Sequence, residues 1–125
     1  MEHVVRFPGG SPPPVGSVLA HLVECHFPVQ VRMIDGELTG PGERVPDRWQ
    51  EVRLGTPGGM VTIIRRDDGV AVVTWGNADE AMQSAWNAVA WAFAATGGGQ
   101  ILGLAGPVSP EGFRVSASLP PEMRR

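Results

Sequence analysis

The sequence predicts an α+β fold, with a mostly antiparallel sheet of about five to six strands and two helices packed on it as a two-layer sandwich. Three observations favour this class. Two turn signals, Asp35–Gly36 and Asp68–Gly69, each separate runs of strand character, which is typical of β-hairpins. Apolar residues also recur at helical spacing from Val15 and again from Ala78. The 125 residues, 1–125, are expected to form a single domain.

The N-terminal part predicts a strand, a turn and a helix. A short strand is expected over 3–7, and the proline- and glycine-rich segment 8–14 then forms an extended turn. Proline has a fixed φ angle and no N–H to donate to a sheet, which excludes a strand there. From Val15 the apolar residues fall on one stripe of a helix, which Pro28 ends.

The first hairpin signal follows this helix. Apolar and polar residues alternate over 29–33, and Asp35–Gly36 accepts the positive φ angles of a tight turn. A polar loop comes next, and residues 49–54 predict a third strand.

The second hairpin is the best defined segment of the chain. Its strands, expected over 60–66 and 70–75, are rich in β-branched residues. With Asp68–Gly69 as the turn, Ile64 is expected opposite Val73, and the residues next to these lie on the other face. Both faces are apolar, which indicates a hairpin in the middle of a sheet, covered by helices or by a partner on each side.

A second helix is expected after this hairpin, with Asn77 as its N-cap. Trp86 lies on the apolar stripe of the helix and is predicted to be core. Trp91 lies roughly 140° further around the helix, so it is expected either as an exposed interface anchor or as a side chain covered by the C-terminal tail. The glycines at 97–99 end the helix.

The C-terminal part predicts one more strand and a partly irregular tail. The strand is expected over 100–104, and the tail covers 105–125. Apolar and polar residues alternate over 113–117, which favours a final edge strand there.

Composition excludes several classes of partner. The net charge of −3 is too small to indicate a nucleic acid, and the apolar runs fall far short of the ~20 residues that span a bilayer. The N-terminal segment has neither a basic leader nor an apolar run, so a cytoplasmic protein is expected. All ten basic residues other than histidine are arginine, which indicates a bacterial source of high GC content.

The reactive side chains predict no catalytic residue, metal or cofactor. His21 and Cys25 are four apart with His26 adjacent, but a zinc site needs three ligands from this short segment, and His26 points along the apolar stripe of the helix. Cys25 is expected to pack as a small hydrophobe, and a Cys/His enzyme is the least favoured interpretation. The glycines at 97–99 follow a helix, whereas a dinucleotide fingerprint precedes one.

These observations favour a small non-enzymatic module for protein–protein interaction, such as an inhibitor, an immunity- or antitoxin-like protein or a regulatory subunit, with homodimerisation as one form. The interface candidates are Trp91, Asn87, Arg65 and Val72. The alternative is a small-ligand or sensor domain with a tryptophan-lined pocket between helix and sheet. The pocket candidates are Trp49, Trp75 and Trp86.

Overall fold

A computed structural model of the chain describes residues 1–40 and 42–124. Within these residues the strands form one eight-stranded antiparallel sheet in the order β3-β2-β4-β5-β6-β1-β7-β8, and three α-helices accompany it. The predicted α+β class with an antiparallel sheet is therefore confirmed, whereas the expected number of strands and helices was too low.

The strands are β1 (Glu2–Arg6), β2 (Gln30–Ile34), β3 (Glu37–Leu38), β4 (Glu51–Thr56), β5 (Gly59–Arg66), β6 (Gly69–Val73), β7 (Gln100–Gly103) and β8 (Gly106–Val108). The helices are α1 (Val15–Glu24), α2 (Glu80–Gly97), α3 (Pro110–Ser116) and the short 3₁₀ helix η1 (Pro121–Arg124). Strands β3 and β8 lie at the edges of the sheet and are two and three residues long. β3 is the second strand of the hairpin predicted at Asp35–Gly36, whereas β8 is an additional strand that is too short for alternation to reveal it.

The predicted edge strand over 113–117 was wrong, because most of this segment belongs to helix α3. Ser109 caps the helix by accepting a hydrogen bond from the Gly112 N–H, and Pro110 occupies the first turn. Serine followed by proline is a start signal for a helix, and it outweighs an alternation of only five residues.

The Asp35–Gly36 turn is confirmed, with φ angles of 49° and 85°. Its aspartate also ties the turn to the next strand, because the backbone N–H groups of Glu51 and Gln50 both donate to Asp35 Oδ1 over 2.8 Å. These two hydrogen bonds hold the pKa of the Asp35 carboxyl below its ordinary value.

The second hairpin has the expected faces but a different register. Arg66 pairs with Gly69, so the two turn residues lie one position earlier than predicted, and Ile64 faces Ala71 rather than Val73. Moving the turn by one position changes every cross-strand partner by two residues. Because side chains alternate between the two faces of a strand, a change of two residues leaves each side chain on its expected face. The faces were therefore predicted correctly although the partners were not.

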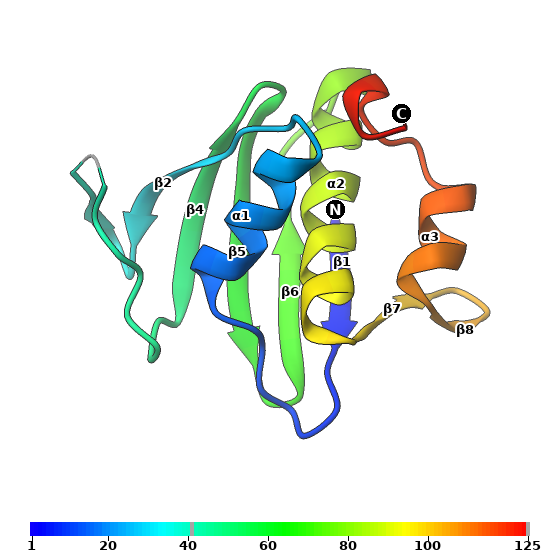
Figure 1. The fold of residues 1–125 in the computed structure, drawn as a ribbon, viewed down its shortest axis with the longest axis horizontal. Coiled ribbons are helices and arrows are strands. Elements are labelled where there is room, and N and C mark those ends of the chain that lie inside the picture. Colours follow the sequence, from blue (N-terminus) through cyan, green and yellow to red (C-terminus); the bar gives the residue numbers. More distant parts are fainter. Residues whose placement is uncertain (41, 125) are drawn as a thin grey trace.

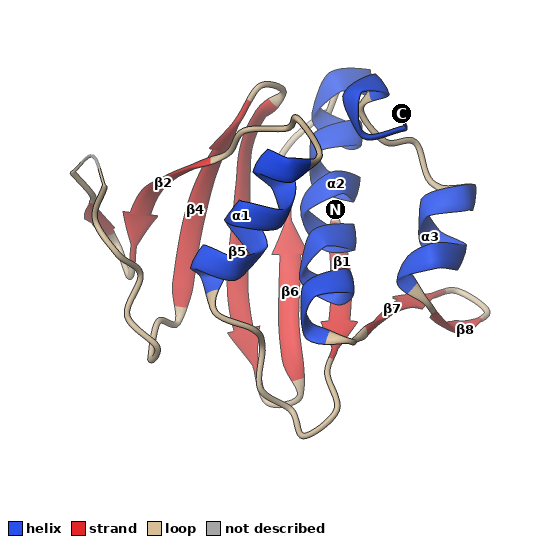
Figure 2. Cartoon of the chain, in the orientation of Figure 1, coloured by secondary structure: helices blue, strands red, loops and turns tan. Residues whose placement is uncertain are grey.

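The helices all lie on one side of the sheet. Helices α1 and α2 lie side by side over the central strands, and α3 flanks α2 above β7 (Figures 1 and 2). Strand residues that face this layer, such as Val5, Ile63 and Val72, are fully buried. The opposite face carries Ile64 and Ala71, and no helix of the described part of the chain packs on it.

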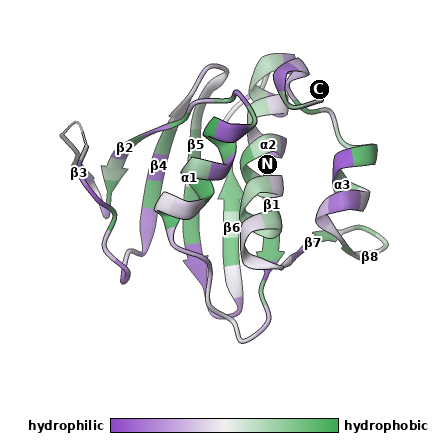
Figure 3. Ribbon diagram, in the orientation of Figure 1, coloured by the Kyte–Doolittle hydropathy of each residue, from purple (hydrophilic) through white to green (hydrophobic). Residues whose placement is uncertain are grey.

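Helix α2 is buried around its whole circumference over 88–94. It packs against α1, against the sheet and against α3, and the alanines of this segment allow each of them to approach closely. Hydrophobic colouring accordingly extends along much of α2 and β6 (Figure 3). The predicted apolar stripe was therefore narrower than the buried surface of the helix. Residues of this segment are apolar on every side of the helix, and such a pattern does not single out one buried stripe.

Candidate functional site

A groove of about 690 Å³ lies at one end of the molecule, where four segments distant in the sequence meet. They are the loop 26–28 after α1, the β4–β5 turn at 57–58, the start of α2 and the segment 120–122 that leads into η1. In Figure 1 these segments all lie at the upper end of the molecule. Pockets of roughly 300–1,000 Å³ are the usual size of binding sites, so the groove is large enough to receive part of a partner.

His26 has an unusual backbone conformation at the edge of this groove, with a φ angle of 61°. It follows Cys25, the C-cap of α1, and the N–H groups of His26 and Phe27 donate to the carbonyls of Val23 and Leu22. These two hydrogen bonds form a Schellman motif, in which glycine is the usual residue at the left-handed position. Histidine at this position therefore lowers the stability of the helix end.

We expect His26→Gly to raise the free energy of unfolding by about 0.5–1 kcal/mol, because glycine adopts the left-handed conformation without a Cβ penalty. Chemical denaturation with urea measures the change. His26→Ala is the matched control, since alanine keeps the Cβ atom and should bring no gain. An equal gain in both variants would show that the backbone conformation is not the cause.

Carboxylates line the side of the groove that α2 forms. Asp79 is the N-cap of α2, and its Oδ1 atom accepts a hydrogen bond from the Met82 N–H over 2.8 Å, so the predicted cap at Asn77 was wrong. Glu80 follows in the first turn, and Glu122 approaches the groove from η1. All three lie among the lining residues, which gives the groove an acidic rim.

Gly58 holds the β4–β5 turn against α2. A Cβ atom at this position would lie only 2.4 Å from the carbonyl oxygen of Ala81 and 3.1 Å from the Cβ of Ala85. Only glycine permits this approach, which closes the groove between the turn and the helix.

Trp75 is the most exposed aromatic residue among those described, with 70% of its surface accessible. It lies in the loop between β6 and α2, the same loop that ends at Asp79 on the groove. The terminal amino group of Met1 donates to the carbonyl of Thr74, so the N-terminus braces this loop beside the tryptophan. A large aromatic side chain left in solvent is a common anchor of protein interfaces.

A second cavity, of about 750 Å³, lies where the segment 11–14 and the start of α1 approach Trp49. Arg65 stacks on the Trp49 ring at 4.6 Å from the ring centre, and its Nε donates to the Trp49 carbonyl over 2.8 Å. Two arginines, Arg44 and Arg65, and two carboxylates, Glu43 and Asp47, are among the residues that line the cavity. Arg65, predicted as an interface candidate, is thus engaged by Trp49 at the border of this cavity.

The three tryptophans predicted to form one pocket are separated in the structure. Trp49 lines the second cavity and Trp75 is exposed, whereas Trp86 is half-buried on α2 and donates its indole N–H to the Val72 carbonyl over 2.7 Å. The prediction of a single tryptophan-lined pocket was wrong, because α2 turns Trp86 toward β1. Trp86 was also predicted to be a core residue, but it is only half-buried and packs against the core.

His3 occupies the space beside Trp86. Its ring stacks on Trp86 with 3.6 Å between ring centres, and Phe113 meets it edge-on at 5.2 Å. His3 Nε2 forms a 2.8 Å hydrogen bond with Asn87 Oδ1, while the Asn87 amide donates to the Ser118 carbonyl. Burial lowers the pKa of His3 below its ordinary value of 6.5, although the Asn87 hydrogen bond opposes the shift. Asn87 is therefore engaged within the molecule and is not a free interface residue.

We expect His3 to make folding stability depend on pH. Its folded-state pKa is lower than its unfolded-state pKa, so the unfolded chain binds more protons between the two values. Its contribution should be complete above about pH 6.5 and should decline as the pH falls below it. Urea unfolding of the wild type and of His3→Gln between pH 8 and pH 5 tests this, and an identical pH dependence in both would contradict it.

Two interface candidates, Trp91 and Val72, are buried. Trp91 is 5% exposed, because His21 packs against it from α1 and the Arg114 guanidinium lies 5.3 Å from its ring centre. Arg114 belongs to α3, so the C-terminal part of the chain covers the Trp91 ring. This is the second of the two expectations for Trp91. Val72 lies beneath the helices and is fully buried. The prediction of an exposed surface at these residues was wrong.

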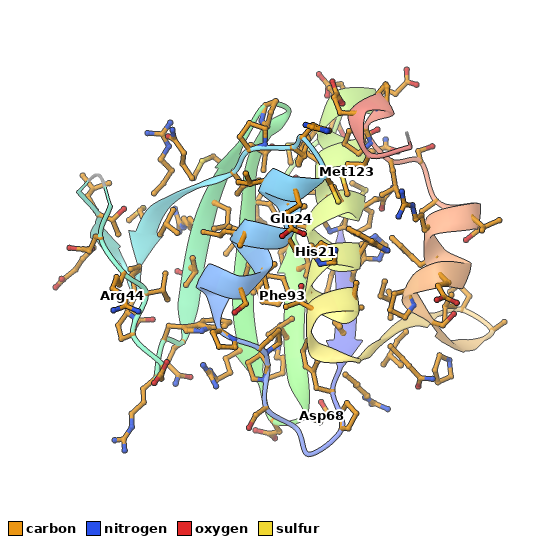
Figure 4. All side chains as sticks on the ribbon, viewed as in Figure 1. His21, Glu24, Arg44, Asp68, Phe93 and Met123 are labelled. Atoms are coloured by element: carbon orange, nitrogen blue, oxygen red, sulfur yellow. The ribbon has the colours of Figure 1, made fainter. Side chains whose placement is uncertain are left out.

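His21 and Cys25 both make contacts within the fold. Figure 4 shows His21 on the side of α1 toward α2, where its Nδ1 forms a 3.0 Å hydrogen bond with Thr96 Oγ1. Cys25 is half-buried and packs against the core. Within the described residues no three histidine, cysteine, aspartate or glutamate side chains lie close enough together to hold a metal ion.

Comparison of the chain with models of protein families, with curated proteins and with solved structures finds no match. None of the helices in the described segments has the length and apolar character that crossing a bilayer requires.

Proposed function

We propose that this protein acts by binding another protein, through the end of the molecule that carries Trp75 and the groove. The roles that fit are those of an inhibitor, an immunity- or antitoxin-like protein or a regulatory subunit. The observation that carries this proposal is the 70% exposure of Trp75, in the loop that ends at Asp79 on the groove of about 690 Å³.

Several features of this end support a contact surface. Proline and aromatic side chains contribute much of the groove wall, and they are Phe27, Pro28, Pro57, Pro120 and Pro121. Met60, which is also substantially exposed, lines a smaller hollow that shares Pro28 and Pro57 with the groove. An exposed aromatic side chain and an apolar hollow with a polar rim are both common features of an interface.

The acidic rim favours a different protein over a second copy of this chain. In a two-fold symmetric contact the same surface meets itself, so the carboxylates of Asp79, Glu80 and Glu122 would face their own equivalents. Like charges brought together in this way oppose association. Light scattering should therefore give the mass of a single chain at micromolar concentration.

Quantitative affinity capture from a bacterial host tests the proposal. Trp75→Ala should reduce the captured partner at least tenfold, because the loss of a hot-spot aromatic commonly costs about 2 kcal/mol or more. Val115→Ala is the matched control, since Val115 is 89% exposed on α3, outside the groove lining. A partner that is retained equally by both variants, or the absence of any specific partner, would refute the proposal.

The second cavity supports a second candidate function, the binding of a small ligand near Trp49. Its two arginines and two carboxylates suit a small polar molecule that carries both charges, such as an amino acid. A thermal-shift screen with the free amino acids tests this, since a ligand at 100 times its Kd stabilises the fold by about 2.7 kcal/mol. No shift with any of them would remove this candidate.

A further inference from the structure

We propose that the groove receives a partner segment in which an apolar side chain stands next to an arginine or lysine. This inference rests on the proposed function, because it assigns the chemistry of the partner at the same surface. It adds the two properties by which that partner would be recognised, an apolar anchor and an adjacent positive charge.

The apolar part of this specificity comes from the groove floor. Phe27 is almost completely buried, so its ring belongs to the core while it also lines the groove. The proline rings around it have few conformations to lose when a partner binds. Ala81 on α2 is small and exposed and leaves room for an incoming side chain.

The charged part comes from the rim. Asp79 and Glu80 stand at the start of α2, where they also complement the helix dipole, but Glu122 reaches the same groove from η1. Three carboxylates from two elements thus border one hollow, and His26 is the single basic residue among the described residues that line it. In the described part of the chain the ion pairs are Arg6–Asp68, Arg53–Glu51 and Arg66–Glu2, all of them outside the groove. Charge complementarity therefore calls for a cation from the partner.

The groove is also held in shape before binding. Gly58 fixes the β4–β5 turn against α2, and the two Schellman hydrogen bonds fix the loop at His26. A preformed hollow loses little conformational freedom when it is filled, so a short peptide is a fair probe of its preference.

The test is selection of phage-displayed random peptides on the wild-type protein, followed by affinity measurements with the most enriched peptide. We expect the enriched sequences to place an aromatic or aliphatic residue beside arginine or lysine. The affinity should fall at least tenfold in the double variant Glu80→Gln/Glu122→Gln and in Ala81→Arg, which fills the hollow. The matched double variant Glu37→Gln/Glu111→Gln removes the same charge outside the groove and should change the affinity less than twofold.

The outcomes separate this inference from the proposed function. Enriched peptides without a basic residue, or peptides that bind the Glu80/Glu122 double variant unchanged, overturn the assigned chemistry. Failure to enrich any peptide, or binding that ignores Ala81→Arg, overturns the groove as the recognition site. In each case the proposed function is tested separately, by the capture of a partner with the wild type and with Trp75→Ala.

Discussion

Trp49→Ala is expected to lower the free energy of unfolding by about 3–5 kcal/mol, the range for a large aromatic residue removed from a packed core. Trp49 is 2% exposed and heads the largest fully buried side chains of the structure. Its loss would leave a cavity and remove the ring on which the Arg65 guanidinium stacks. At roughly 4 °C per kcal/mol, the melting temperature should fall by about 12–20 °C.

Trp75→Ala serves as the control for this prediction, because it removes the same side chain from an exposed position. Substitutions at such positions usually change stability by about 0.5 kcal/mol or less. Thermal melts of the two variants should therefore differ widely. Similar melting temperatures would show that Trp49 is not packed in the core as described.

Gly69→Ala should destabilise the fold by about 3 kcal/mol or more, through overlap rather than through a cavity. A Cβ atom on Gly69 would lie 1.8 Å from the carbonyl oxygen of Val5, in the neighbouring strand β1. That contact involves the backbone of a neighbouring strand, at the end of the ladder beside the β5–β6 turn, and backbone cannot move aside as the end of a long side chain can. The pairing of β1 with β6 would have to open locally.

The control for this effect is Gly16→Ala, an equally small change in helix α1. A Cβ atom at Gly16 meets no other atom within 4 Å, and alanine is a better helix former than glycine by up to about 1 kcal/mol. Urea denaturation should thus show a gain or no change for Gly16→Ala and a large loss for Gly69→Ala. A loss of less than 1 kcal/mol in the latter would refute the close packing of β1 and β6.

The parts of the fold that could be predicted have strong local signals. Turn residues such as Asp35–Gly36 accept positive φ angles that few other residues accept, and the hairpins followed from them. The edge strand β8 could not be predicted, because its pairing with β7 involves only three residue pairs. Helix α3 had a readable start at Ser109–Pro110, which a short alternation concealed.

The candidate site was less predictable than the fold. Burial of Trp91 depends on α1 and α3 approaching α2 from both sides, and no periodicity within α2 contains that information. The groove is formed by four short segments that are distant in the sequence. The one sequence signal for them is proline near the ends of elements, as at Pro28 and Pro57, which makes these segments rigid. His26, Ala81 and Glu122 were missed as site residues for this reason.

Site-specific photo-crosslinking in a bacterial host tests most directly whether the Trp75 end is the binding surface. A photoreactive phenylalanine analogue replaces residue 75 in one variant and Val115, an even more exposed residue on α3, in the other. We expect a covalent adduct with one partner protein from position 75, at a yield at least about tenfold above that from position 115, since interface anchors are desolvated on binding. Equal yields from both positions, or an adduct from position 115 alone, would contradict it.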